Sequence, residues 1–295
     1  MIALPLGWWG WSALDGPGGS RPGGLPALAN GAVGPTLDSL SLNSTSAYLT
    51  RFGQPDAPLL DQAGDQAMSP GSLVKMMTAV VVLAADLPLD RTITLSADIF
   101  NQAAELDLTT SGFEPGEMVN VRDLLYGMML PSGADCAIGL AEAVAGDEAS
   151  FADLMNDQAA ELGMTGSHFT NASGAYDPDL YLTAHDMVTL LNHALTIPEF
   201  ASIFTAHGHT SAPTNLHPDG VSVTSTFFQA DNGQGDGFAI IGAKTGYTTT
   251  AGQSLASLAE VDGQRYLLVT AGAATTDNLH DLRHINDARL IYSAI

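Results

Sequence analysis

Basic residues are scarce in this chain, and lysine and cysteine are scarcer still. The 295 residues include 9 lysines and arginines against 32 acidic residues, which gives a formal charge of −23 and a pI near 4.2. Such a surface repels nucleic acid and anionic lipid headgroups, so we expect no nucleic-acid partner. The single cysteine, Cys136, excludes an intrachain disulfide and is best explained as a small core residue.

No basic segment opens the chain, because the first basic residue is Arg21. Residues 1–14 are mostly apolar, but the run is too short to span a bilayer and lacks the basic start of a signal peptide. It fits the remnant of a leader, an interfacial anchor or a disordered tail, which leaves membrane association open. Residues 15–37 are rich in glycine and proline, as linkers are. We therefore expect a leader remnant or flexible linker over residues 1–39 and one folded domain over residues 40–295.

Only two lysines occur, and each stands in a distinctive place. Lys75 follows Ser72 by three residues at the start of a mostly apolar stretch, and Lys244 begins a Lys-Thr-Gly sequence. Residues at i and i+3 of a helix share a face, so the first spacing places an amine beside a hydroxyl. A buried amine loses its charge more readily, and a neutral amine can take the proton of a serine nucleophile. The alternative is a lysine whose stem reaches the surface.

Periodicity and turn residues predict strands near both ends of the chain and helices between them. We expect strands over residues 46–50, 58–60, 238–244, 253–259 and 266–271, and helices over residues 72–87, 121–130, 137–145, 151–162, 186–195 and 277–293. Glycine, proline and aspartate predict turns at residues 53–56, 114–117, 248–252 and 262–263. Strands contributed by both ends favour an α+β fold in which one sheet adjoins a helical lobe.

Histidines and acidic residues form three weaker patterns. His280 and His284 have the i, i+4 spacing of zinc ligands, but no third ligand is evident, so we interpret them as part of a solvated helix face. His207 and His209 lie in an expected loop and receive the same interpretation. Residues 231–237 hold glycines and two aspartates but lack the spacing of an EF-hand loop, so we expect a turn there.

Three motifs, in order and spacing, resemble those of one enzyme family. They are Ser72-Leu73-Val74-Lys75, Ser132-Gly133-Ala134 and Lys244-Thr245-Gly246. The chain resembles the D-alanyl-D-alanine carboxypeptidases, which are low-molecular-weight penicillin-binding proteins, over about residues 46–295. Shorter matches connect the motifs: Met155-Asn156, residues 161–164, His168-Phe169-Thr170-Asn171, Gly174, Thr183-Ala184 and Asp186-Met187. The resemblance implies an antiparallel sheet flanked by helices with a helical lobe, as in serine β-lactamases.

The resemblance also implies acyl transfer through a serine ester. Ser72 would attack the carbonyl of the penultimate D-alanine of a peptidoglycan stem peptide, and Lys75 would take its proton. Ser132, which alone would be read as a helix cap, would relay a proton to the leaving amine. We expect burial, the positive end of the helix and the cation of Lys244 to lower the pKa of Lys75. No metal and no organic cofactor is needed.

The same resemblance implies the substrate contacts. Lys244 and Thr245 would hold the terminal carboxylate, and Gly246 would let substrate approach the strand edge without a Cβ in the way. The backbone N–H groups of Ser72 and Tyr247 would form the oxyanion hole.

Two departures from the family pattern bear on these contacts. The second motif usually ends in asparagine, and Ala134 lacks the amide that would bind the substrate's peptide carbonyl and help to orient Lys75. An arginine that often helps to hold the carboxylate has no counterpart in residues 272–275.

Several functions compete on these residues. A D,D-carboxypeptidase is favoured, with β-lactams as inhibitors and a place outside the cytoplasm, where its substrate lies. A class A β-lactamase is disfavoured because the sequence has no Glu-x-x-Leu-Asn, a class C-like esterase because no Tyr-x-Asn occurs, and an α/β-hydrolase because no Gly-x-Ser-x-Gly occurs. A non-catalytic wall-binding or penicillin-binding protein would explain Ala134, but the two lysines at motif positions argue against it.

Overall fold

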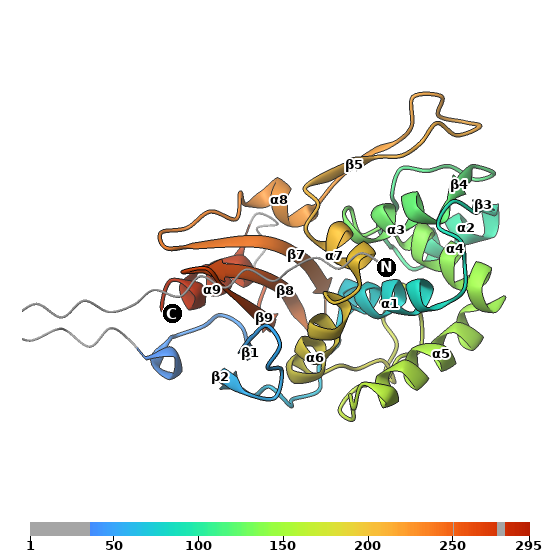
Figure 1. Cartoon of the computed structure of the whole chain (residues 1–295). Coiled ribbons are helices and arrows are strands. Elements are labelled where there is room, and N and C mark those ends of the chain that lie inside the picture. Colours follow the sequence, from blue (N-terminus) through green and yellow to red (C-terminus); the bar gives the residue numbers. More distant parts are fainter. Residues whose placement is uncertain (1–35, 250, 276–280) are drawn as a thin grey trace, which may run out of the picture. The chain divides into compact units, whose positions relative to one another are not determined.

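The main sheet has five antiparallel strands, and its order brings the two ends of the folded part together (Figure 1). The computed structural model describes residues 36–249, 251–275 and 281–295. The hydrogen-bonded order is β2-β1-β9-β8-β7, with β1 Ser46–Arg51, β2 Pro58–Gln62, β7 Phe238–Thr248, β8 Gly252–Val261 and β9 Gln264–Ala273. All five strands were predicted, and the antiparallel pairing confirms the α+β fold class.

Both faces of the sheet are buried, which explains the near-continuous apolar sequence of its inner strands. In β8, Leu255 and Ala259 pack into the core on the α9 side, whereas Ala256 and Leu258 face the helices of the other side. The turn between β8 and β9 is Asp262–Gly263, and both residues have positive φ, as a two-residue hairpin of type I′ requires.

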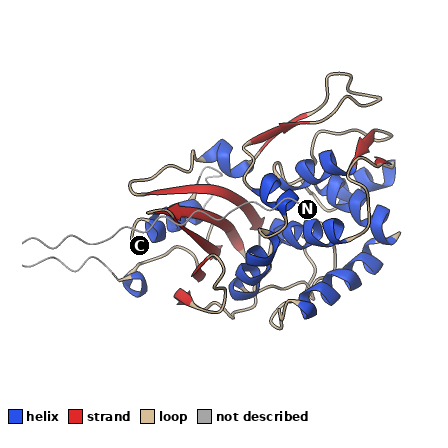
Figure 2. Ribbon diagram, in the orientation of Figure 1, coloured by secondary structure: helices blue, strands red, loops and turns tan. Residues whose placement is uncertain are grey.

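Nine helices are present in the part of the chain that the structure describes, and most form a lobe beside the sheet (Figure 2). They are α1 Lys75–Ala84, α2 Ala97–Glu105, α3 Val121–Met129, α4 Ala134–Ala145, α5 Glu148–Glu161, α6 Ala184–Ala194, α7 Pro198–Phe204, α8 Thr226–Ala230 and α9 Arg283–Tyr292. Helix α6 contacts β1 and β9, and α9 contacts β8 and β9 from the opposite face. Helix α1 is buried on nearly all sides, as its apolar sequence predicts.

Short elements complete the described chain. Two single 3-10 turns occur, η1 (Leu37–Ser39) and η2 (Gly71–Val74), and two small antiparallel sheets pair β3 (Thr92–Thr94) with β4 (Met118–Asn120) and β5 (Gly208–Thr210) with β6 (Ser222–Thr224). Side chains cap three helices: Asn120 for α3, Asp147 for α5 and Thr183 for α6 each accept a backbone N–H three residues on.

Several predicted boundaries were wrong by a few residues. The helix expected from residue 72 starts at Lys75, because residues 71–74 form the tighter η2. Helix α4 begins three residues before the predicted start. The described part of the expected 277–293 helix is α9, and residues 277–280 lie outside the described residues, as do residues 1–35. The domain boundary at residue 40 therefore stays a prediction.

Among the described residues, no single helix is both long and apolar enough to cross a membrane. Helices α6 and α7 would meet that test only as a pair, and the pair is bent by 117°.

Candidate active site

Ser72 lies in η2, and this turn packs closely against the edge strand β7. A Cβ on Gly246 would lie 2.8 Å from the carbonyl oxygen of Pro70, and one on Gly71 would lie 2.7 Å from that of Tyr247. Real Cβ atoms essentially never approach backbone so closely, so a larger residue at either position would push the turn and the strand apart. The two glycines therefore fix the position of Ser72 relative to β7. This packing role of Gly246 adds to the one predicted at the strand edge.

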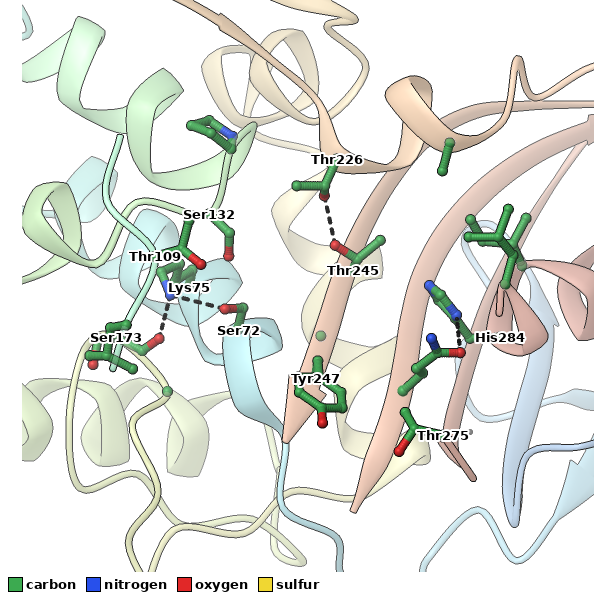
Figure 3. Close-up of a pocket in the computed structure, with 18 of the residues that line it drawn as sticks. Ser72, Lys75, Thr109, Ser132, Ser173, Thr226, Thr245, Tyr247, Thr275 and His284 are labelled. Atoms are coloured by element: carbon green, nitrogen blue, oxygen red, sulfur yellow. Dashed lines mark hydrogen bonds between the residues drawn. The ribbon is translucent and has the colours of Figure 1, made fainter. Parts of the chain in front are cut away.

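Lys75 lies directly beneath Ser72 and is buried. Its Nζ atom is 3.1 Å from the Oγ atom of Ser72 and also donates to the carbonyl oxygen of Ser173 (Figure 3). Burial, the first of the predicted influences, lowers the pKa of Lys75 to about 8, although the nearby Asp135, Cys136 and Glu148 oppose this shift. A substantial fraction of this amine is therefore neutral near physiological pH.

Ser132 and Lys244 form a second pair across the pocket. The Nζ atom of Lys244 donates to the Oγ atom of Ser132 over 2.9 Å and to the carbonyl oxygen of Thr245. Ser132 has a φ of +71°, which is unusual for a residue with a Cβ. The cap of helix α4 is Gly133, with no side-chain hydrogen bond, so the alternative role of Ser132 as a cap does not occur.

The two ammonium groups repel each other inside the protein. Burial first, and the charge of Lys75 second, hold the pKa of Lys244 well below its usual value. The prediction that Lys244 lowers the pKa of Lys75 is therefore not confirmed; the effect runs the other way, from Lys75 to Lys244.

One pocket of about 470 Å³ connects these groups. It extends from Ser72 and Lys75, past Ser132, over β7 to the first turn of α9. The hydroxyls of Thr245 and Thr226 lie 2.7 Å apart in its wall (Figure 3). Tyr247 is 52% exposed at its mouth. Of the predicted site residues, Ser72, Lys75, Ser132, Thr245, Gly246 and Tyr247 line the pocket.

Ala134 and Lys244 are predicted site residues that do not line this pocket. Lys244 reaches it only through Ser132, as described above. Ala134 begins α4 and is 1% exposed, with its N–H bonded to the carbonyl oxygen of Thr109. Beside it, the buried carboxylate of Asp135 accepts hydrogen bonds from the N–H and hydroxyl of Ser111. The start of α4 is thus anchored from its buried side.

The structure also shows where the histidine and aspartate patterns of the sequence lie. The interpretation of His284 as a solvated residue is wrong, because it is 6% exposed and lines the pocket, while its predicted partner His280 lies outside the described residues. His209 lies in β5 and bonds the buried Asp123 over 2.6 Å, so it is not a free loop residue. The N–H of Gly233 donates to the carboxylate of Asp231, as in the predicted turn, and the same carboxylate binds Arg289. No group of three or more metal-binding side chains occurs among the described residues.

Sequence reasoning did not assign several polar pocket residues to the site: Asp107, Thr109, Ser173, Thr226, Gln253, Thr275 and His284. Ser173 lies next to Gly174, whose own position was noted, and a Cβ there would overlap the backbone of Gly71. That glycine was the available signal for a segment lying against Gly71 and Ser72. For Thr226 and Gln253 the sequence offers no comparable signal.

The chain belongs to the D-alanyl-D-alanine carboxypeptidase family, whose model matches residues 49–275. It is 32% identical over 225 residues to D-alanyl-D-alanine carboxypeptidase DacC of Escherichia coli, which covers 74% of this chain and 54% of that protein. It is 34% identical over 204 residues to DacB2 of Mycobacterium tuberculosis, covering 68% of this chain and 66% of that protein. The chain thus spans between about half and two thirds of the length of these curated relatives.

Solved structures agree with this assignment. The Streptomyces K15 DD-transpeptidase superposes with a TM-score of 0.76 at 26% identity, over 86% of this chain and 97% of that one. Family and fold, both predicted from the three motifs, are therefore confirmed.

Proposed function

We propose that this protein is a serine D-alanyl-D-alanine carboxypeptidase that removes the terminal D-alanine of peptidoglycan stem peptides through an acyl-enzyme on Ser72. The observation that carries the proposal is the meeting of three distant motifs at one pocket, with Ser72 beside Lys75 and Ser132 beside Lys244. Membership of the family supports the same reaction.

Acylation begins with the neutral form of Lys75. With a pKa of about 8, roughly a tenth of this amine is neutral at pH 7. It takes the proton of Ser72 across the 3.1 Å contact while Oγ attacks the carbonyl carbon of the penultimate D-alanine. The backbone N–H groups of Ser72 and Tyr247 stabilise the oxyanion, where one lost donor costs about 10²–10³ in rate.

The leaving D-alanine needs a proton on its amine. Ser132 passes one from the protonated Lys75, and its hydroxyl is oriented by the hydrogen bond from Lys244. Water then attacks the ester, Lys75 again serves as base, and the shortened peptide leaves while the Ser72 hydroxyl is restored. The balance is one peptide bond hydrolysed by one water.

The terminal carboxylate of the peptide lies against the hydroxyl of Thr245, which is itself bonded to Thr226, with the amine of Lys244 behind the strand. The carbonyl that an asparagine amide would bind in the usual second motif has no such partner at Ala134. We therefore expect the substrate backbone to depend more on the edge of β7, near Gly246 and Tyr247.

An amine in place of water would turn the same acyl-enzyme into a transpeptidase. The Streptomyces K15 protein that superposes on this chain is named a DD-transpeptidase, which favours transfer as the second candidate. Both candidates act on cell-wall peptides outside the cytoplasm, and β-lactams would acylate Ser72 in either.

A fluorescent penicillin tests the proposal. Labelling of the wild-type protein and release of D-alanine from a pentapeptide are expected, both abolished in Ser72→Ala. Ser69→Ala, three residues earlier and outside the pocket, is the matched control and should retain both. Labelling that persists in Ser72→Ala would remove Ser72 from its role, and labelling without D-alanine release would favour transfer or a non-catalytic binding protein.

A further inference from the structure

The pocket has a second end, away from Ser72, whose wall comes from the start of β8 and the first turn of α9. Gln253, Leu282, His284 and Ile285 line it (Figure 3). Tyr247 pairs with Gln253 across the two strands, and Thr245 pairs with Leu255. Paired residues project from the same face of a sheet, so the Thr245 hydroxyl and this wall share the α9 side.

His284 has a defined tautomer in this wall. Its Nδ1 atom is 2.8 Å from the Oε1 atom of Gln253, and the amide Nε2 atom of Gln253 donates to the carbonyl oxygen of Asp281 over 2.6 Å. The second bond fixes which end of the amide is the oxygen. Since that oxygen only accepts, Nδ1 of His284 carries the hydrogen, and Nε2 bears a lone pair. No group among the described residues hydrogen-bonds to this Nε2.

The first turn of α9 favours an anion at the same place. No described side chain caps this helix, whose N-cap residue is Leu282. The first N–H groups of a ten-residue helix carry a partial positive charge and attract carboxylates and phosphates. A helix end alone would prove little, but here a residue that is more than nine-tenths buried, His284, adds an unpartnered polar atom in the same wall of the pocket.

The charges around His284 are few. Burial lowers the pKa of His284 to about 4, against the opposing effects of Asp287 and Asp281. The Asp287 carboxylate is held by Asn43 and Ser44. The imidazole is therefore neutral at pH 7 while the pocket is empty.

The other ionisable groups around His284 either are paired with each other, lie farther along the pocket, or lie on the other face of the sheet. Asp281 is bonded to Arg283, on the helix of His284 itself. From β7 the phenol of Tyr247 faces the pocket, whereas Lys244 projects toward Ser132 on the opposite face. Lys75 and Asp107 line the end near Ser72.

We propose that this end of the pocket binds the terminal carboxylate of the substrate, and that at mildly acidic pH His284 is protonated on Nε2 as the carboxylate binds. The inference rests on the proposed function and deepens it. The proton comes from solvent, and the product is an imidazolium–carboxylate ion pair between the α9 terminus and Thr245. No arginine of the described chain lines this pocket, so His284 supplies a cation that exists only in the complex.

Linkage gives the sign of the effect. A carboxylate in contact raises the pKa of the imidazole, and each unit of that rise strengthens binding about tenfold once the pH is below both values. The affinity for a carboxylate-ended peptide therefore grows as the pH falls from 7 toward 4, by about 10–100-fold for a rise of one to two units. The affinity for a peptide that ends in a neutral amide does not increase in this way as the pH falls.

Calorimetry on the Ser72→Ala protein tests this without turnover. An acetylated peptide ending in D-Ala-D-Ala and its C-terminal amide are titrated at pH 5 in two buffers of different ionisation enthalpy. Proton uptake on binding is expected for the acid and not for the amide, and the preference for the acid should rise as the pH falls. Because Lys75 is present in both titrations, the difference in proton uptake between the acid and the amide excludes any uptake by Lys75.

Two variants separate His284 from other causes. His284→Arg should bind the acid tightly at every pH without proton uptake, and His284→Phe should lose the proton uptake and the increase in the preference for the acid at low pH. His193→Gln, a histidine outside the pocket, should behave as the parent protein.

Equal proton uptake with acid and amide, or uptake that persists in His284→Phe, would overturn the inference. The acid–amide comparison uses a protein with His284 intact, so it tests the inference even if a His284 variant does not fold. Failure of wild-type protein to be labelled by penicillin would instead count against the proposed function.

Discussion

Replacing Gly246 by alanine is the most informative perturbation of the nucleophile's support. The added methyl would lie 2.8 Å from the carbonyl oxygen of Pro70, 3.1 Å from the Cγ atom of Leu73 and closer still to the Oγ atom of Ser254. The serine side chain can rotate away, but the carbonyl of Pro70 belongs to the turn that carries Ser72. The strand and the turn must therefore separate by several tenths of an ångström.

Two magnitudes follow from this displacement. Overpacking of this kind costs about 1–3 kcal/mol in the free energy of unfolding. For a domain of this size, that lowers the melting temperature by roughly 3–10 °C. A shift of a catalytic atom approaching 1 Å costs up to about 10²-fold in rate, so penicillin acylation should slow by about 10–100-fold.

A second glycine on the same strand provides the control. A Cβ on Gly242 would lie 2.8 Å from Cδ1 and 2.9 Å from the carbonyl oxygen of Phe204, which is in α7 and away from Ser72. Gly242→Ala should lower the melting temperature by a similar amount. Its rate constant for acylation, measured by stopped-flow fluorescence at 20 °C, should equal that of the wild-type protein. The reasoning fails if Gly246→Ala acylates at the wild-type rate, or if both variants slow equally.

Two further predictions concern pH. The acylation rate constant should rise about tenfold between pH 7 and pH 9 as Lys75 loses its proton around its pKa of about 8, whereas Lys75→Arg should show neither the rise nor much activity in a stopped-flow pH profile. At acid pH the segment 208–224 should loosen. Burial raises the pKa of Glu117, but hydrogen bonds from Thr214, His217 and a backbone N–H outweigh it and leave this pKa below its usual 4.5. The stabilisation by ionised Glu117 is complete above that value and is lost as the pH falls through the lowered pKa. Amide exchange in the segment, measured by mass spectrometry, should accelerate there, and a Glu117→Gln protein that showed the same acceleration would contradict the assignment.

Much of the architecture follows from local signals in the sequence. Short apolar runs bounded by turn residues predict all five main strands, because both faces of the sheet are covered and Asp262–Gly263 satisfies a specific turn. The three motifs predict the cluster around Ser72, since a costly buried lysine needs a partner and Lys75 and Lys244 are the only lysines of the chain. These inferences depend on properties that neighbouring residues express by themselves.

The remainder depends on contacts between distant segments. Nothing near Gly246 in the sequence shows that Pro70 lies against it. Likewise, the helical period places His284 on one side of α9 but does not tell which side meets the sheet, so a buried pocket residue resembled a solvated one. The tight η2 turn at Ser72 also escapes periodicity, because four residues are too few to distinguish a 3-10 turn from the start of a helix.

The place of β1 between β2 and β9 has a consequence for biosynthesis. The ribosome makes β1 some two hundred residues before its partner β9, so the central sheet cannot close while the chain is still short. Until it does, Lys75 and Lys244 lack the shared burial that lowers their pKa values, so the base proposed for Ser72 is not yet formed. Activity is therefore acquired in one late step, after the last strand has been translated.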